Sequence, residues 1–235
     1  MALGGLLILR ADRLAVFAFV MVGWILSVMA HEFSHAAVAW LGGDRTVAEK
    51  GYLSLDPRRY GDLGVSLVLP LIALAMGGVG FPGGAVYIRN DLIRTRLWRT
   101  AAALAGPAAT LVILLAISFG LSFWRGWGLD GAGPVALFEA LTVLGFLQAT
   151  GLILNLLPIP GLDGFGAIRP FLPARLDPHI RKLEGLVMVG LLLAIFWLPG
   201  VGAVLFRAAG QVSLAVGLDL DALQGGWRAF HFWQR

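Results

Sequence analysis

The sequence predicts an all-α polytopic membrane protein, and three observations support this fold class. Of the 235 residues, 58% are hydrophobic and 14% are charged, whereas a soluble domain averages about 25% charged residues. The mean hydropathy is +0.82. Apolar runs of membrane-spanning length follow one another with only short polar stretches between them. We therefore expect a multi-helix bundle of about five transmembrane helices plus a re-entrant segment, with short β-strands near its functional site.

The apolar runs differ in length and in the breaks they contain. The first, Leu14–Leu41, has no charged residue between Leu14 and Ala30. It lacks a small-residue cleavage signature, so we expect a retained span and not a signal peptide. The second, Leu63–Gly80, is short and contains Pro70, which favours a re-entrant segment enclosed by other helices. Three further runs are long enough to cross a bilayer: Thr100–Trp124, Val135–Leu157 and Leu183–Phe206.

The composition indicates one membrane-embedded domain over residues 1–235, with its core at about 14–206 and an interfacial tail at 207–235. The tail is amphipathic, because Asp219–Arg235 mixes polar side chains with aromatic ones. The chain has no cysteine, which excludes disulfides and thiolate metal ligands. Its net charge of +4 arises mainly in short loops between apolar runs. That pattern is typical of membrane topology signals and does not indicate nucleic-acid binding.

The segment His31-Glu32-Phe33-Ser34-His35 stands inside the first apolar run. Residues four apart on a helix lie on one face, so the two imidazoles can bind one tetrahedral zinc ion. Glu32 beside them is suited to take a proton from a zinc-bound water. Ionisable groups at membrane depth are costly and usually functional. The motif predicts a zinc site with His31 and His35 as ligands and Glu32 as the catalytic base; a chance occurrence of the pattern is the alternative.

A second group of polar and helix-breaking residues follows the fourth run. Pro158, Pro160 and several glycines interrupt the helix where Asp163 appears. Broken backbone at membrane depth is tolerated only against protein or a water-filled cavity. Asp163 on such a break is suited to be a third zinc ligand, which leaves one coordination position for water. The alternative is that Asp163 caps the helix that follows Gly164.

Together, the HExxH segment and the distant stretch Asn155-Leu156-Leu157-Pro158-Ile159-Pro160-Gly161-Leu162-Asp163-Gly164 resemble the site-2 protease family of intramembrane zinc metalloproteases. The similarity is to the compact bacterial branch and covers roughly residues 25–200. Further similar stretches are Leu55-Asp56-Pro57, Gly80-Phe81-Pro82, the basic loop Arg89–Arg99, and Ala105-Gly106-Pro107 at the start of the third long helix. Gly106 and Pro107 are interpreted as a site of close helix contact at that helix start.

The resemblance implies one Zn²⁺ per chain, held by His31, His35 and Asp163, with Glu32 as the base. Two positions depart from the family. Thr110 stands where many members have Asn, and residues 81–88 lack the usual Lys-Pro-Val pattern. Neither position is expected to touch the metal.

The resemblance also implies a substrate cleft near Asn155. The break that contains Pro158, Pro160 and Gly164 is expected to form the wall of this cleft and of a water path to the metal. For Asn155 the alternative is structural, since its amide can satisfy backbone carbonyls freed near Pro158.

The metal site sets a condition on the topology. His31 and His35 lie in the later half of their helix, so Asp163 must come to the face where that helix exits. This occurs if Leu63–Gly80 is re-entrant, and that arrangement places 12 of the 18 Lys and Arg residues on the same face. A full second span gives a split of 10 to 8. The positive-inside rule therefore favours the re-entrant arrangement, with the active site facing the cytosol. The compact chain and the resemblance imply a prokaryotic plasma membrane.

The predicted function is zinc-dependent hydrolysis of a peptide bond in or next to a transmembrane segment of a membrane-protein substrate. An exposed backbone edge in Lys50–Leu55 or Gly83–Ile88 is expected to hold the unwound substrate by strand addition. Two other classes of function remain open: a metal-binding membrane protein or transporter without peptidase activity, and an inactive relative acting as a binding scaffold. The expected partners are the transmembrane substrate and the lipid bilayer, without nucleic acid. The sequence leaves the identity of the substrate and the oligomeric state open.

Overall fold

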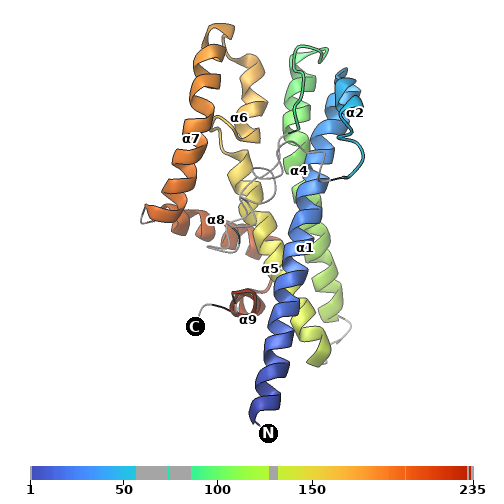
Figure 1. Ribbon diagram of the computed structural model, residues 1–235, viewed down its shortest axis with the longest axis vertical. Coiled ribbons are helices and arrows are strands. Elements are labelled where there is room, and N and C mark those ends of the chain that lie inside the picture. Colours follow the sequence, from blue (N-terminus) through green and yellow to red (C-terminus); the bar gives the residue numbers. More distant parts are fainter. Residues whose placement is uncertain are drawn as a thin grey trace.

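The computed structural model describes residues 2–56, 74, 86–126, 132–198, 200–231 and 233. Within this part of the chain every regular element is a helix, so the expected short β-strands are not found among the described residues. The run Leu63–Gly80, expected to be re-entrant, lies outside the described residues apart from Leu74. Figure 1 shows an elongated helical bundle with the N-terminus at its lower end.

Three long helices form the centre of the bundle: α1 (Ala2–Gly42), α4 (Arg96–Gly126) and α5 (Ala132–Leu156). They run alternately up, down and up in Figure 1 and pack against one another. Each contains a stretch long and apolar enough to cross a membrane. A Cβ atom on Gly23 would lie 2.6 Å from Cδ2 of Leu144. The missing side chain of Gly23 therefore lets α1 approach α5 closely, as small residues do between membrane helices.

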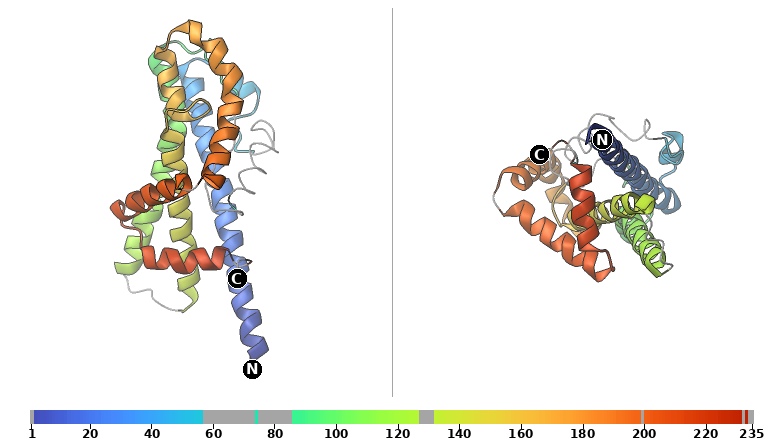
Figure 2. Two further views of the ribbon diagram at one scale, coloured as in Figure 1. Left: turned by 90° about the vertical axis from the view of Figure 1, so that its left-hand side faces the viewer. Right: turned by 90° about the horizontal axis from the view of Figure 1, so that it is seen from below.

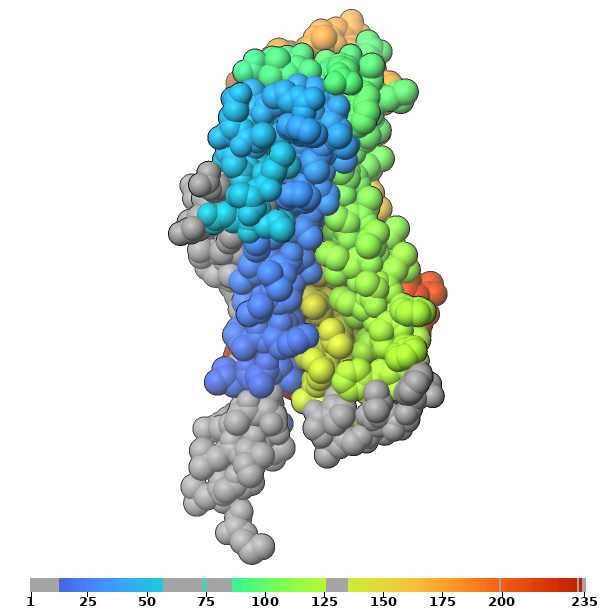
Figure 3. Space-filling view, turned by 90° about the vertical axis from the view of Figure 1, so that its right-hand side faces the viewer, coloured from blue at the N-terminus to red at the C-terminus, as the bar shows by residue number. Residues whose placement is uncertain are grey.

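The segments that follow α1 return to the end of the bundle where α1 finishes. Helix α2 (Thr46–Glu49) comes directly after α1, and the backbone N–H of Arg94 donates to the carbonyl of Gly42 at 3.0 Å. Figure 3 shows residues 43–56 beside the chain that leads into α4 at this end. Helix α4 thus begins where α1 ends, which is the condition that the predicted topology set for closing the metal site.

Beyond α5 the chain forms shorter elements. Helix α6 (Asp163–Ile168) and two 3₁₀ turns, η3 (Arg169–Phe171) and η4 (Ala174–Leu176), lead to α7 (Asp177–Trp197). The expected span over Leu183–Phe206 is not one straight helix. It ends at Trp197, and α8 (Val201–Ala215) begins three residues after Leu198 at an angle of 85°. Gly200 has a φ of +93°, in the left-handed region that favours glycine, and this explains the sharp turn.

The described residues contain three helices able to cross a membrane, or four if α7 and α8 count as one bent span. Three or four of the roughly five expected spans therefore lie in this part of the chain. The predicted amphipathic tail segment forms the helix α9 (Leu220–Phe230). In this helix the side chain of Phe230 is fully buried, whereas Arg228 is exposed. Figures 1 and 2 show α8 and α9 lying across the bundle and not along it.

Candidate metal centre

The HExxH segment lies on α1, as the sequence predicts. His31, Glu32 and His35 are all buried, with 7%, 5% and 6% of each residue exposed. The helical repeat places both imidazoles on one face, and their Nε2 atoms lie 3.0 Å apart. Helix α1 alone therefore brings two metal-ligating atoms to one point.

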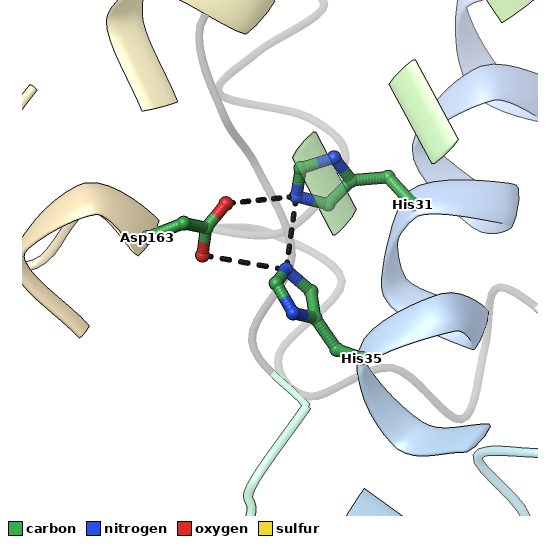
Figure 4. A group of neighbouring side chains, drawn as sticks. All are labelled: His31, His35 and Asp163. Carbon is green, nitrogen blue, oxygen red and sulfur yellow. Dashed lines mark hydrogen bonds and ion pairs between the residues drawn. The ribbon is translucent and has the colours of Figure 1, made fainter. Parts of the chain in front are cut away.

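Asp163 reaches the same point from the other side of the bundle. Its Oδ2 lies 3.1 Å from Nε2 of His31, and its Oδ1 lies 3.3 Å from Nε2 of His35 (Figure 4). The sequence had left open that Asp163 caps a helix. In the structure Leu162 is the N-cap of α6, Asp163 is the first helical residue, and no side chain caps this end of α6.

The donor set of these three residues fits a cation. Nδ1 of His35 lies 2.7 Å from the carbonyl oxygen of Ala102. A carbonyl can only accept, so Nδ1 carries the proton and Nε2 of neutral His35 presents a lone pair. Possible ligand atoms of His31, His35 and Asp163 all lie within 4.8 Å of one another. Atoms bound about 2.0–2.1 Å from one tetrahedral zinc stand roughly 3.3 Å apart, close to the separations found here.

Gly106 on α4 leaves room beside this group. A Cβ atom at Gly106 would lie 2.2 Å from Nε2 of His35 and 2.4 Å from Nε2 of His31. The sequence had placed Gly106 and Pro107 at a helix start. That placement was wrong, because α4 begins at Arg96 and Pro107 lies inside it. Close contact is indeed what Gly106 permits, but the contact is with the two metal-ligating rings.

Two groups on α4 orient the imidazoles. Besides the bond from His35 to the Ala102 carbonyl, Nδ1 of His31 lies 2.9 Å from Oγ1 of Thr110. Such bonds on the distal nitrogen fix the tautomer and the ring orientation of a metal ligand. Sequence reasoning missed both partners. In the sequence, Thr110 stands out only as a departure from the family pattern. Its distance along the chain from the two histidines does not indicate that it contacts either of them.

Glu32 is hydrogen-bonded to the main chain of the segment that precedes α4. Its Oε2 accepts the backbone N–H of Val86 at 3.2 Å. The carboxylate sits next to His31 on the same helix turn, buried among the groups of the candidate metal centre. This position is suited to proton transfer at the centre.

The four residues expected at the cleft take different positions. Asn155 is buried near the end of α5, Pro158 is exposed, and Pro160 is half-buried in the break that follows. A Cβ on Gly164 would lie 2.2 Å from the carbonyl oxygen of Leu156, so Gly164 lets the first turn of α6 pack on the end of α5. Among the described residues, no hydrogen bond joins Asn155 to the three candidate ligands.

The fold and the site define a helical, multi-pass membrane protein in which His31, His35 and Asp163 form a group that could hold a metal ion. Comparison with known proteins agrees. The chain is 40% identical over 215 residues to "Putative zinc metalloprotease Rip2" of Mycolicibacterium smegmatis, covering 84% of this chain and 80% of that protein. It is 41% identical over 203 residues to the protein of the same name in Mycobacterium tuberculosis strain H37Rv, with 83% and 75% covered.

A more distant relative is "Putative zinc metalloprotease YwhC" of Bacillus subtilis, 26% identical over 174 residues, with 73% of this chain and 77% of that protein covered. No family model and no solved structure matches the chain. The chain belongs to the site-2 protease family of zinc metalloproteases. It is a metalloprotease of the membrane, and its cofactor is zinc.

Proposed function

We propose that this protein is an intramembrane endopeptidase of the HExxH type, which cleaves transmembrane segments of membrane-protein substrates. The observation that carries the proposal is the convergence of His31, His35 and Asp163, with Glu32 beside them. His31, Glu32 and His35 lie on α1, a helix of membrane-spanning length, and Asp163 reaches them from the short helix α6. A metal site for a soluble substrate has no need of this depth. Ionisable groups at membrane depth are costly and usually functional.

His31, His35 and Asp163 hold the zinc ion in this proposal. When bound, zinc supplies Lewis-acid polarisation of a peptide carbonyl and activation of water at neutral pH. Glu32 takes the proton from the attacking water and delivers it to the leaving amine, as a general base and then a general acid. Thr110 and the Ala102 carbonyl keep both imidazoles turned towards the centre.

Access to the centre is from the side of Asp163. The Asp163 side chain is 21% exposed, whereas those of His31 and His35 are 9% and 7% exposed. The break in which Pro158 and Pro160 lie leads directly to Asp163, and Asn155 precedes this break. We therefore place water and the substrate backbone on this side of the site.

The substrate must be unwound before attack, because a helix occupies its amides in internal hydrogen bonds. Residues 86–88 are not helical, and their side chains alternate between half-buried, exposed and half-buried positions. Part of the segment Gly83–Ile88, expected to bind a strand, lies outside the described residues, but its end is next to Glu32. Pairing of substrate with this extended backbone follows the general mode of strand addition.

The active site faces the cytosol in this proposal. Basic residues gather at the end of the bundle where α1 finishes (Figure 1). They lie on both sides of α2, before and in the first turn of α4, in η3 and η4, and near the start of α7. They are Arg45, Lys50, Arg89, Arg94, Arg96, Arg99, Arg169, Arg175, Arg181 and Lys182. The positive-inside rule favours a cytosolic position for this end. Because the named relatives are bacterial proteins, the membrane in this proposal is a bacterial plasma membrane.

The orientation has a direct test, since the chain contains no cysteine. Single cysteines replacing Arg175 and Arg13, both exposed, can be labelled in intact cells with a membrane-impermeant maleimide. We expect labelling at position 13 without lysis and at position 175 only after lysis. The reverse pattern would contradict the cytosolic active site.

The activity is tested in proteoliposomes with a tagged single-span substrate. The wild-type protein should cleave it, a zinc chelator should stop cleavage, and re-added zinc should restore it. Glu32→Gln should keep bound zinc and lose cleavage by roughly a hundredfold or more, since a general base contributes about 10²–10⁴. A protein that binds zinc but never cleaves, or a Glu32→Gln variant at the parent rate, would favour the alternative of a metal-binding membrane protein or transporter.

A further inference from the structure

A short extended segment, Val86–Arg89, connects the base Glu32 to a second buried carboxylate, Asp44. Val86 and Ile88 pack against the apolar cluster at the end of α1, while Tyr87 is 74% exposed. The backbone N–H of Val86 donates to Glu32 at 3.2 Å, and that of Arg89 donates to Oδ2 of Asp44 at 2.7 Å. The segment is thus fastened at both ends by carboxylates that flank the last turns of α1.

Asp44 is the firmer of the two attachments. It is fully buried, with 0% of the residue exposed. Its Oδ1 accepts the backbone N–H of Thr46 at 3.0 Å and the Thr46 hydroxyl at 2.6 Å, while Oδ2 is directed at Arg89. Both carboxylate oxygens are therefore used, one to begin α2 and the other to hold the extended segment. Bonds to a charged acceptor are stronger than those between neutral groups.

The surroundings leave this segment little freedom. Nζ of Lys50 donates to the carbonyl of Tyr87 at 3.0 Å, and Arg94 is bonded to the end of α1. Gly43 has a φ of +125°, and a Cβ there would lie 2.8 Å from the carbonyl oxygen of Leu92. The end of α1 and the chain that precedes α4 therefore pass each other at backbone contact, and Asp44 fixes where they do so.

We infer that Asp44 is a positioning residue for Glu32, acting through the main chain of Val86–Arg89. Asp44 accepts a hydrogen bond from the N–H of Arg89 and so fixes this end of the segment. Because Val86 lies only three residues earlier, its N–H is kept in hydrogen-bonding distance of Oε2 of Glu32. This contact orients the carboxylate and leaves Oε1 for the proton of the attacking water. The inference rests on the role proposed above for Glu32. Neither the sequence motifs nor the similarity to known proteases singles out Asp44.

The two functions of Asp44 can be separated by substitution. Asp44→Ser keeps a side-chain oxygen that can accept from the N–H of Thr46 and begin α2, but one hydroxyl cannot serve Thr46 and Arg89 together. Thr46→Ala removes the hydroxyl bond and leaves the bond to Arg89. Arg89→Ala removes the exposed guanidinium and leaves its N–H. Thr46→Ala and Arg89→Ala are therefore matched controls for Asp44→Ser.

Three kinds of measurement should be made on the whole chain in detergent or proteoliposomes: bound zinc, hydrogen exchange of the Val86 and Arg89 amides, and steady-state kinetics (kcat and KM) with the tagged substrate. We expect Asp44→Ser to retain zinc, to exchange both amides faster, and to lose kcat by about tenfold to a hundredfold with KM little changed, as displaced catalytic groups do. Thr46→Ala and Arg89→Ala should stay within about twofold of the wild type in kcat.

An unchanged kcat in Asp44→Ser, with an active wild type, would overturn the inference. Loss of zinc or of folding in Asp44→Ser would overturn it too, because Asp44 would then hold the helices and not the base. If the wild-type protein fails to cleave, the proposed activity is wrong. The exchange data still decide the coupling in that case, since unaltered protection of Val86 in Asp44→Ser removes the connection to Glu32.

Discussion

The candidate metal centre and the region under α9 are held together by different kinds of contact. At the metal-centre end, α1 and α4 are joined by hydrogen bonds of His31 to Thr110 and of His35 to the Ala102 carbonyl. Where α9 crosses α1 and α5, the contacts are aromatic. The rings of Phe17 and Phe230 stack with centroids 5.3 Å apart, and Trp227 meets Phe146 edge-on at 5.7 Å.

The difference shows how this fold separates stability from chemistry. Van der Waals packing of aromatic and aliphatic side chains drives much of the association of membrane helices, and a polar group buried in it costs free energy unless it is hydrogen-bonded. Hydrogen bonds add little net stability but fix direction. Substitutions at the metal centre should therefore alter zinc binding and cleavage at little cost in stability, and substitutions under α9 should do the reverse.

The largest effect is expected from removing a zinc ligand. Asp163→Ala leaves two imidazoles for an ion that needs three protein ligands at a catalytic site. We expect bound zinc, measured by atomic emission, to fall to background and cleavage to become undetectable, while the melting temperature in detergent without added zinc changes little. Asp163→Ala with full zinc occupancy would show that another residue is the third ligand.

A smaller effect is expected from Thr110→Val, which keeps the side-chain shape and removes the hydroxyl that contacts His31. Loss of such a partner typically costs a metal site about 10–100-fold in affinity or activity. Zinc titration and cleavage rates measure it, and Thr110→Ser is the matched control because it retains the hydroxyl. Equal rates for the valine and serine variants would contradict an orienting role for Thr110.

The sequence predicts the residues of the candidate metal centre better than it predicts the groups that hydrogen-bond to the two imidazoles. The spacing of His31 and His35 dictates one helix face, and the break before Asp163 marks a carboxylate at a helix end. Both facts are local and can be read from a few residues. Thr110 and Ala102 are 79 and 67 residues from the histidines that they contact. Their positions depend on how α4 is set against α1, which no local pattern encodes.

The errors in the predicted helices have similar causes. Hydropathy predicts a single span from Leu183 to Phe206, although Pro199 and Gly200 lie between these residues. An average over composition cannot detect the turn of 85° that occurs near Gly200, whose φ is left-handed. The sequence predicts a helix start at Gly106 and Pro107, whereas α4 begins at Arg96. Proline is common at a helix start, but membrane helices also accommodate it in their interior, where neighbouring groups satisfy the freed carbonyl.

Under α9, Phe230→Ala should affect stability more than chemistry. Phe230 is fully buried in the cluster that includes Val20 and Leu147. Replacing a buried phenylalanine by alanine costs about 3–5 kcal/mol through lost contacts and the cavity left behind. We expect a lower melting temperature, with zinc content and the cleavage rate at permissive temperature within about twofold of the wild type. A Phe230→Ala variant that keeps its melting temperature but loses zinc would contradict the separation of stability from chemistry.

The smallest effect is expected from the exposed pair of Arg89 and Asp91. The guanidinium donates to both carboxylate oxygens at 2.9 and 2.7 Å, and these bonds lower the pKa of Asp91 to about 2. Because the pKa of the folded state lies below the value of about 3.9 in an unfolded chain, the pair stabilises the protein fully above that value and ceases to do so as the pH falls through 2.

Solvent and salt screen this pair, so its contribution is small at any pH. Asp91→Asn should leave the cleavage rate unchanged and shift the melting temperature slightly at pH 7 and low salt, with the difference from the wild type vanishing in high salt or near pH 2. The N–H of Arg89 that holds Asp44 belongs to the backbone and is untouched by this substitution. A marked loss of cleavage in Asp91→Asn would therefore show that the Arg89 side chain, and not only its main chain, positions the segment beside Glu32.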